Sequence, residues 1–100
     1  GRRDRLIKSM DVQVSLDEVE DILRKSMIVR QLAVTSTEHP ILGRRIEAHI
    51  CLIDPEGAKE FRTFARKNLS KFQLPRVFNF VETLPETASG KINYSALSNV

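Results

Sequence analysis

The sequence predicts an α+β fold, in which a small mixed three-stranded sheet is flanked by helices and preceded by a short two-stranded hairpin. Three observations predict it. Residues 15–27 carry a capped amphipathic pattern typical of a helix, residues 45–54 alternate like a strand, and Asp54–Pro55 opens a second helical pattern. Helices and strands mixed along so short a chain are typical of helices packed against one sheet.

The N-terminal third predicts a hairpin and then a helix. Residues 5–8 and 12–14 are short extended pieces on either side of a small polar turn. In the helix that follows, Ser15 is a suitable N-cap, and Glu18 stands three residues later, at the capping-box spacing. The apolar stripe of this helix consists of Leu16, Val19, Ile22, Leu23 and Met27.

Two strands are expected next. Residues 29–36 form the first, and residues 37–45 are predicted as a loop because Pro40 and Gly43 interrupt them. Residues 45–54 are apolar on both faces at their far end, which predicts a central strand. Since the two strands are close in sequence, we expect them to pair antiparallel.

The second half predicts a helix, a strand and a short helical end. Asp54 and Pro55 suit the N-cap and first turn of the helix. Residues 76–82 are predicted as the third strand, 84–91 as a polar loop and 94–100 as one or two helical turns. The buried face of the middle helix consists of Ala58, Phe61, Phe64, Ala65 and Leu69.

The composition indicates one small domain without a membrane span. The chain has 100 residues and a net charge of +3, and no apolar run approaches the ~18 residues of a membrane helix. The lone Cys51 lies in an apolar run, so we expect a buried thiol and a reducing, cytoplasmic location. Because the chain starts without Met, in a polar stretch, we also expect it to be a domain of a longer protein.

Most familiar catalytic patterns are missing from the sequence. His39 and His49 have no cysteine or carboxylate at metal-ligand spacing, so no metal site is predicted. The "SGK" stretch lacks two residues of a phosphate-binding loop, because Pro85 and Ile92 occupy their positions.

Lys91 is the remaining candidate for chemistry. Alone, it is best explained as a solvated lysine on a mobile loop. Ser89 and Gly90 beside it are small and permit unusual backbone angles, so a second interpretation is a positive charge on a flexible tether. Such a charge suits a phosphate or carboxylate that another domain holds.

Four stretches, taken together, resemble a known family. "GRRDRLIK", "VSLDEVEDIL", "LGRRIEAHICL" and "LPETASGKINYSAL" occur in this order between Gly1 and Leu97. They resemble the C-terminal subdomain of the adenylate-forming (ANL) superfamily, which includes acyl-CoA synthetases, nonribosomal peptide synthetase adenylation domains and beetle luciferases. The resemblance implies that residues 1–100 are a mobile lid, with a missing N-terminal domain that binds ATP, Mg²⁺ and a carboxylic acid. It further implies formation of an acyl-adenylate and transfer of the acyl group to CoA or to the phosphopantetheine of a carrier protein.

The resemblance also implies roles for single residues. Asp4 corresponds to the hinge, Arg2 to a residue beside the nucleotide, and Lys91 to the adenylation lysine. Lys8 and Asp11 fall on the thiolation face, where the pantetheine arm enters.

Two positions depart from the family pattern. Asp11 stands where a glycine is expected, and an acidic side chain there narrows the tunnel or repels a phosphate-bearing thiol. The acceptor therefore stays open between CoA, a carrier protein and neither. Asp tolerates left-handed backbone better than most residues, so the fold is expected to persist. Tyr94 stands where many members have Arg or Lys, and we expect little mechanistic consequence.

Two other functions remain open. The chain can be a non-catalytic basic module that contacts RNA or an acidic protein, although it lacks the aromatic platform typical of single-strand binders. It can also be a relic of a ligase lid that serves only for interaction. The cations of the basic module would be Arg2, Arg3, Arg5, Lys8 and Lys91. If the chain is part of a ligase, we expect no nucleic-acid partner.

Overall fold

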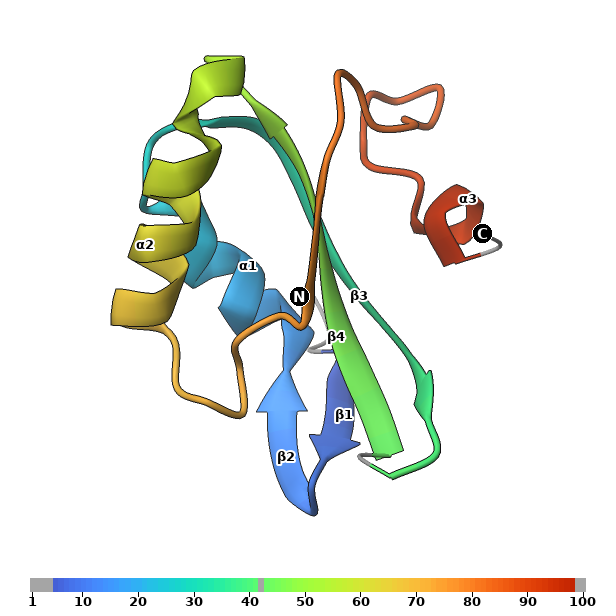
Figure 1. Ribbon diagram of the computed structural model, residues 1–100. Helices are drawn as coiled ribbons and strands as arrows, with labels where there is room; N and C mark the ends of the chain where they lie inside the picture. The colour runs from blue at the N-terminus through green and yellow to red at the C-terminus, as the bar shows by residue number, and fades with distance from the viewer. Residues whose placement is uncertain (1–4, 42, 99–100) are drawn as a thin grey trace.

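The computed structural model describes residues 5–41 and 43–98, and it confirms the α+β class (Figure 1). Its elements are β1 (Leu6–Ser9), β2 (Val12–Ser15), α1 (Leu16–Arg24), β3 (Val29–His39), β4 (Gly43–Leu52), a 3-10 turn (Pro55–Gly57), α2 (Ala58–Asn68), β5 (Val77–Phe80) and α3 (Tyr94–Ser98). β1 and β2 form an antiparallel hairpin. The other strands form a mixed sheet in the order β3-β4-β5, with β3 antiparallel and β5 parallel to β4. No helix among the described residues is long and apolar enough to cross a membrane.

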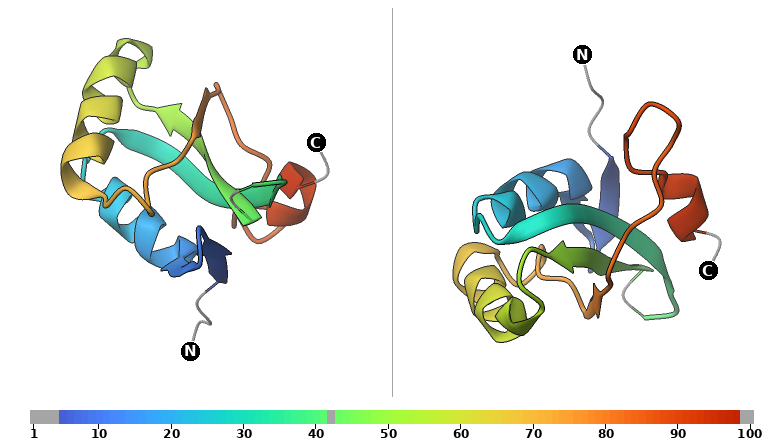
Figure 2. Two further views of the ribbon diagram at one scale, coloured as in Figure 1. Left: turned by 60° about the horizontal axis from the view of Figure 1, so that its bottom comes forward. Right: turned by 90° about the horizontal axis from the view of Figure 1, so that it is seen from above.

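The three-stranded sheet separates two unequal layers. α1 and α2 cover one face, and the C-terminal segment with α3 lies against the other (Figure 2). Cross-strand partners share a face, so the register assigns Val34, Ala48 and Phe78 to the helix side. His49 and Asn79 are likewise paired and point to the other side. β4 pairs with both β3 and β5, so it is the central strand, as predicted.

The main core lies between the sheet and the two long helices. Val19 and Leu23 of α1 are fully buried, as is Phe61 of α2. The Phe61 ring meets the rings of Phe78 and Phe80 edge-on, with centroids 6.1 Å apart in each pair. Edge-to-face contacts of this kind add to the free energy gained by burying the rings.

Both predicted helix starts are confirmed. The amide of Glu18 donates a hydrogen bond of 3.1 Å to the Ser15 hydroxyl, which caps α1. The Asp54 carboxylate accepts the amide of Glu56 at 3.0 Å, and Pro55 follows it in the first turn. That first turn is 3-10, and the α-helical part of α2 begins only at Ala58.

The predicted end of the first helix is wrong. α1 ends at Arg24, and Met27 is 81% exposed instead of continuing the apolar stripe. The amides of Ser26 and Met27 bond to carbonyls three residues earlier, which tightens the chain into turns. Met27 then adopts φ of 64°, a left-handed conformation that ends a helix.

The predicted loop over 37–45 is also wrong in extent. β3 continues to His39 and β4 begins at Gly43, so the connection is residues 40–42. Polar contacts between β3 and β4 extend the strand pairing into the predicted loop. The Arg44 guanidinium, for example, donates to both the hydroxyl and the carbonyl of Ser36. Gly43, at φ of 87°, begins the return strand in a conformation that suits glycine.

We expect Phe61→Ala to lower the free energy of unfolding by about 3–5 kcal/mol, because the change leaves a cavity against two aromatic rings. Urea unfolding followed by circular dichroism measures this loss. Met27→Ala is the matched control, since it truncates a side chain that is 81% exposed. Equal losses in both variants would contradict the placement of the core.

Candidate functional site

The loop that carries Lys91 is a hydrogen-bonded turn at the surface. The Thr87 amide donates to the Lys91 carbonyl at 2.7 Å, and the Gly90 amide donates to the Thr87 carbonyl at 2.9 Å. Gly90 has φ of 86° with open space around the position of a Cβ atom, so backbone conformation, not crowding, favours glycine there. Lys91 is exposed, and its chain segment turns away from the sheet (Figure 1).

The base of this loop is attached to the sheet. The Gln31 side chain on β3 donates to the Glu86 carboxylate at 2.7 Å and accepts the Leu84 amide at 2.8 Å. Across the loop, Glu86 pairs with Ile92 as an isolated antiparallel bridge. The tip that presents Lys91 therefore stands on a fixed base. The flexibility expected of Ser89 and Gly90 stays a prediction.

The β1–β2 turn has the geometry expected for a position that favours glycine. Met10 and Asp11 have φ of 53° and 65°. A two-residue hairpin with both central φ angles positive is a type I′ turn, in which Gly, Asn and Asp are preferred. Asp11 thus adopts the left-handed backbone, and its side chain is exposed, as is that of Lys8.

The two candidate sites lie at opposite ends of the domain. In Figure 1 the β1–β2 turn is at the bottom, and the Lys91 loop is at the top right. Lys8 and Asp11 therefore do not share a site with Lys91. Arg2 and Asp4, the predicted nucleotide neighbour and hinge, lie outside the described residues.

Arg5, directly after the predicted hinge, is held by an internal ion-pair network. Its Nε lies 3.0 Å from Asp17 Oδ1, and its Nη2 lies 2.8 Å from Glu20 Oε2. Its Nη1 donates to the Val34 carbonyl at 2.8 Å. Burial lowers the pKa of Arg5, but the Glu20 charge and the side-chain bonds to the Asp17 and Glu20 carboxylates outweigh it and leave the pKa above its usual value.

Glu20 is the centre of this network. Its side chain is 2% exposed, and Oε2 accepts the Val34 amide at 2.7 Å and the Tyr94 hydroxyl at 2.8 Å. Arg24 lies 3.4 Å from the other carboxylate oxygen. Burial and the bond to Glu20 raise the pKa of Tyr94 to about 12, so this phenol remains a donor at neutral pH.

The sequence analysis missed this cluster. The sequence did contain a signal for it. Counted from Leu16, Glu20 stands at i+4 and Leu23 at i+7, so Glu20 lies on the apolar stripe of α1. An acid in such a position has to find buried partners. Tyr94, for which little consequence was expected, is one of them.

A polar groove lies along the sheet face opposite the helices, lined by residues of β3, β4 and β5. His49 lies there at 9% exposure, with Nε2 2.9 Å from the Thr35 hydroxyl and Nδ1 3.5 Å from the Asn79 amide. Burial lowers the pKa of His49, and the Glu47 charge opposes this only in part. Cys51, on the same face, is buried as predicted and donates to the Glu82 carbonyl at 3.0 Å.

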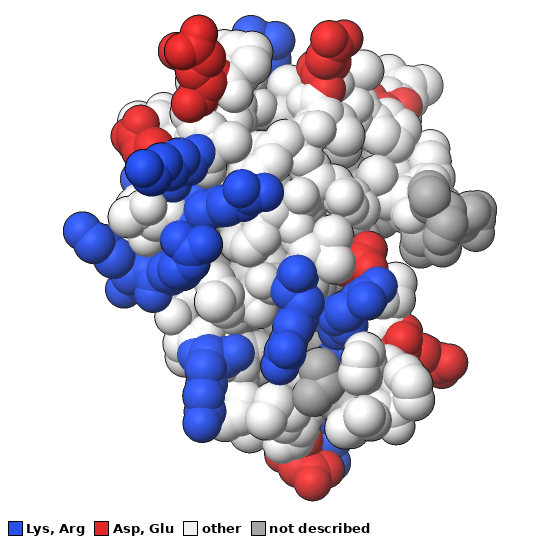
Figure 3. Space-filling view, in the orientation of Figure 1, with Lys and Arg blue, Asp and Glu red and all other residues white. Residues whose placement is uncertain are grey.

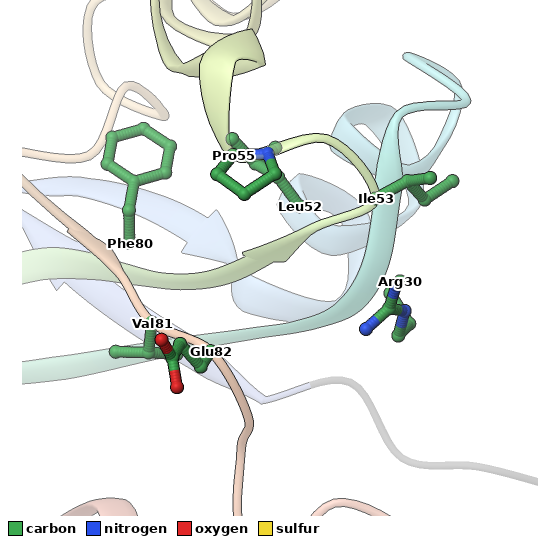
Figure 4. A pocket seen from close by; sticks show the side chains of 7 residues that line it. All are labelled: Arg30, Leu52, Ile53, Pro55, Phe80, Val81 and Glu82. Atoms are coloured by element: carbon green, nitrogen blue, oxygen red, sulfur yellow. The ribbon is translucent and has the colours of Figure 1, made fainter.

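A second hollow, of about 490 Å³, opens at the carboxyl ends of β4 and β5 (Figure 4). It offers apolar side chains and two opposite charges, with no paired acid and base or activated nucleophile. Its lining is Arg30, Leu52, Ile53, Pro55, Phe80, Val81 and Glu82. Among the described residues, no group of three or more His, Cys, Asp or Glu is arranged to hold a metal ion.

Of the five cations named for a basic module, the structure describes Arg5, Lys8 and Lys91. Lys8 and Lys91 lie at opposite ends, and Arg5 is committed to internal carboxylates, so these three form no common patch. Figure 3 shows lysines and arginines instead over α2 and the segment after it. The exposed cations of these segments are Lys59, Arg62, Arg66, Lys67, Lys71 and Arg76.

The chain belongs to the family described as the AMP-binding enzyme C-terminal domain, whose model matches residues 18–91. It is 35% identical to the human mitochondrial acyl-coenzyme A synthetase ACSM5, over 97% of this chain and 18% of that protein. It is also 35% identical to 4-hydroxybutyrate–CoA ligase 1 of Metallosphaera sedula, over 92% of this chain and 17% of that protein. The chain thus spans less than a fifth of these relatives.

Solved structures agree. An acyl-CoA synthetase from Brucella canis matches 97% of this chain and 19% of its own, with a TM-score of 0.80 and 33% identity. The o-succinylbenzoate CoA synthetase of Bacillus subtilis matches 99% of this chain and 20% of its own, with a TM-score of 0.81 and 28% identity. The resemblance to the adenylate-forming superfamily is therefore confirmed.

We expect stability to fall as the pH drops below the ordinary His pKa of 6.5, because His49 keeps a lower pKa when folded. The unfolded chain then binds more protons than the folded one, so protons favour unfolding. Urea unfolding at several pH values between about 5 and 7.5 measures the slope, and His49→Gln should reduce it. An unchanged slope in the variant would remove His49 as its source.

Proposed function

We propose that this chain is the mobile C-terminal domain of an AMP-forming acid–thiol ligase. The observation that carries the proposal is the separation of its two candidate sites. The Lys91 loop and the Lys8–Asp11 turn project from opposite ends of the domain (Figure 1). One orientation presents only one of them to an adjoining active site, so a two-step reaction requires the domain to turn between steps.

In the first step, Lys91 supplies charge to a reaction housed in an N-terminal domain of the same protein. That domain binds ATP, Mg²⁺ and a carboxylic acid. The Lys91 ammonium lies between the attacking carboxylate and the α-phosphate and offsets the charge that develops in the transition state. The products are an acyl-adenylate and pyrophosphate. Two features support this role: Lys91 is exposed, and the Glu86–Ile92 bridge closes the base of its loop.

Before the second step, the domain rotates about Asp4, and Arg2 leaves its place beside the nucleotide. The β1–β2 turn then faces the site, and the thiol of CoA or of a carrier-protein phosphopantetheine displaces AMP. Lys8 guides the arm. The relatives named as CoA ligases favour CoA as the acceptor. The cytoplasmic location stays a prediction, because one relative is named as a mitochondrial protein.

The competing function is a basic interaction module for RNA or an acidic protein. The exposed cations of α2 support it, since Lys59, Arg62 and Arg66 lie on one helix. Binding through this face would weaken steeply with added salt. Filter binding of generic RNA at two ionic strengths tests the RNA-binding form, and absence of binding at physiological salt would exclude that form.

In the enzyme that carries this domain, we expect Lys91→Ala to lower ATP–pyrophosphate exchange by about 10²–10³, the typical loss of one preorganised contact. Thioester formation from preformed acyl-adenylate should change far less, because the lysine has then turned away. Lys25→Ala, at another exposed lysine, is the matched control and should leave both steps intact. Normal exchange by Lys91→Ala would refute the role of Lys91.

We expect Asp11→Gly to speed thioester formation and leave adenylation unchanged. Glycine adopts the φ of 65° without strain and removes the negative charge from the path of a phosphate-bearing thiol. Steady-state kinetics with varied CoA should show a lower KM. Asp11→Asn is the matched variant, because it keeps the turn preference and removes only the charge. A KM for CoA that is unchanged in both variants would exclude Asp11 from the thiol path.

A further inference from the structure

Tyr94 joins the two mechanically important parts of the domain. It is the third residue after Lys91, and its hydroxyl donates to Glu20 at 2.8 Å. The guanidinium carbon of Arg5 lies 4.4 Å from the centroid of the Tyr94 ring. Arg5 directly follows Asp4, the proposed hinge. The Tyr94 side chain thus contacts Arg5 in the segment next to the proposed hinge, here called the hinge-side segment. The same side chain attaches the C-terminal end of the Lys91 loop to Glu20.

The contact is anchored from both sides. Glu20 is tied to the sheet through the Val34 amide, so the oxygen that receives the phenol is fixed by the backbone of β3. Between Lys91 and Tyr94, Ile92 is bridged to Glu86, and the Asn93 amide donates to the Pro85 carbonyl at 2.9 Å. These bonds restrict the backbone between Tyr94 and the tip of the Lys91 loop.

We propose that Tyr94 is a positioning residue for adenylation, which fixes the Lys91 loop relative to the hinge-side segment through Glu20 and Arg5. This inference rests on the proposed function of Lys91. The carboxylate keeps the Arg5 ion pair and the Val34 amide when the phenol is removed, so Tyr94→Phe leaves it compensated and the domain folds. The effect is then a looser lysine loop.

The contact itself is tested by a spectroscopic titration of Tyr94. The chain contains one tyrosine and no tryptophan, so its absorbance change at high pH reports Tyr94 alone. Circular dichroism first establishes that the 100-residue chain and its Glu20→Gln variant are folded. We then expect a pKa of about 12 for Tyr94 in the unchanged chain and a lower pKa in Glu20→Gln, which removes the charge. An ordinary tyrosine pKa of 10.0 in the folded chain overturns the proposal.

The role is tested in the enzyme that carries this domain. Tyr94→Phe should lower kcat for adenylation by about 10- to 100-fold, since small misplacements of a reacting group cost up to about 100-fold. KM for ATP and thioester formation from preformed acyl-adenylate should stay unchanged. Arg24→Gln is the matched control, because Arg24 contacts the same carboxylate at 3.4 Å but is not connected to the loop. An equal loss in Arg24→Gln, or none in Tyr94→Phe, overturns the inference.

A double variant separates this inference from the function on which it rests. If Tyr94 acts through Lys91, adding Tyr94→Phe to Lys91→Ala should cause no further loss of adenylation. Additive losses overturn the positioning role while the catalytic role of Lys91 stands. Normal adenylation by Lys91→Ala alone overturns the proposed function instead.

Discussion

The buried carboxylate of Glu20 is the constraint on which the arrangement of this domain depends. A charge with a side chain 2% exposed is stable only where donors replace its lost water. These donors come from separate parts of the chain, namely Arg5 before β1, Arg24 in α1, the Val34 amide in β3 and Tyr94 at the start of α3. Since all must meet at one point, a single charge sets the relative positions of the hairpin side, the first helix, the sheet and the C-terminal end.

Such a network suits a part that moves as a unit. In the proposed mechanism, rotation at Asp4 exchanges the Lys91 loop for the Lys8–Asp11 turn. The exchange delivers each group accurately only if the body between them does not deform. The packed core lies between the sheet and α1 and α2. The ion pairs of Arg5 attach the segment before β1 to this core, and the hydrogen bond from Tyr94 to Glu20 attaches α3.

Local patterns predicted most of the elements. The Ser15 cap and the apolar spacing of α1 depend on neighbouring residues alone, and the doubly apolar end of β4 was enough to make it the central strand. The errors came where distant contacts outweigh local preference. The polar residues after Thr35 looked like a loop, yet contacts such as Arg44 with Ser36 extend the ladder to His39. Met27 fitted the helical stripe by spacing, but the chain had already turned.

The sequence by itself determined the fold class, the family and the identity of the candidate residues, because caps, periodicity and short motifs are encoded in residues close together in the chain. Only the tertiary structure decided how these residues combine. It put the Lys91 loop and the β1–β2 turn at opposite ends, held Arg5 in ion pairs with Asp17 and Glu20, and brought Tyr94 to Glu20 across 74 positions of sequence. The physical reason is that a buried charge selects its partners by proximity after folding, and no spacing in the sequence records that proximity.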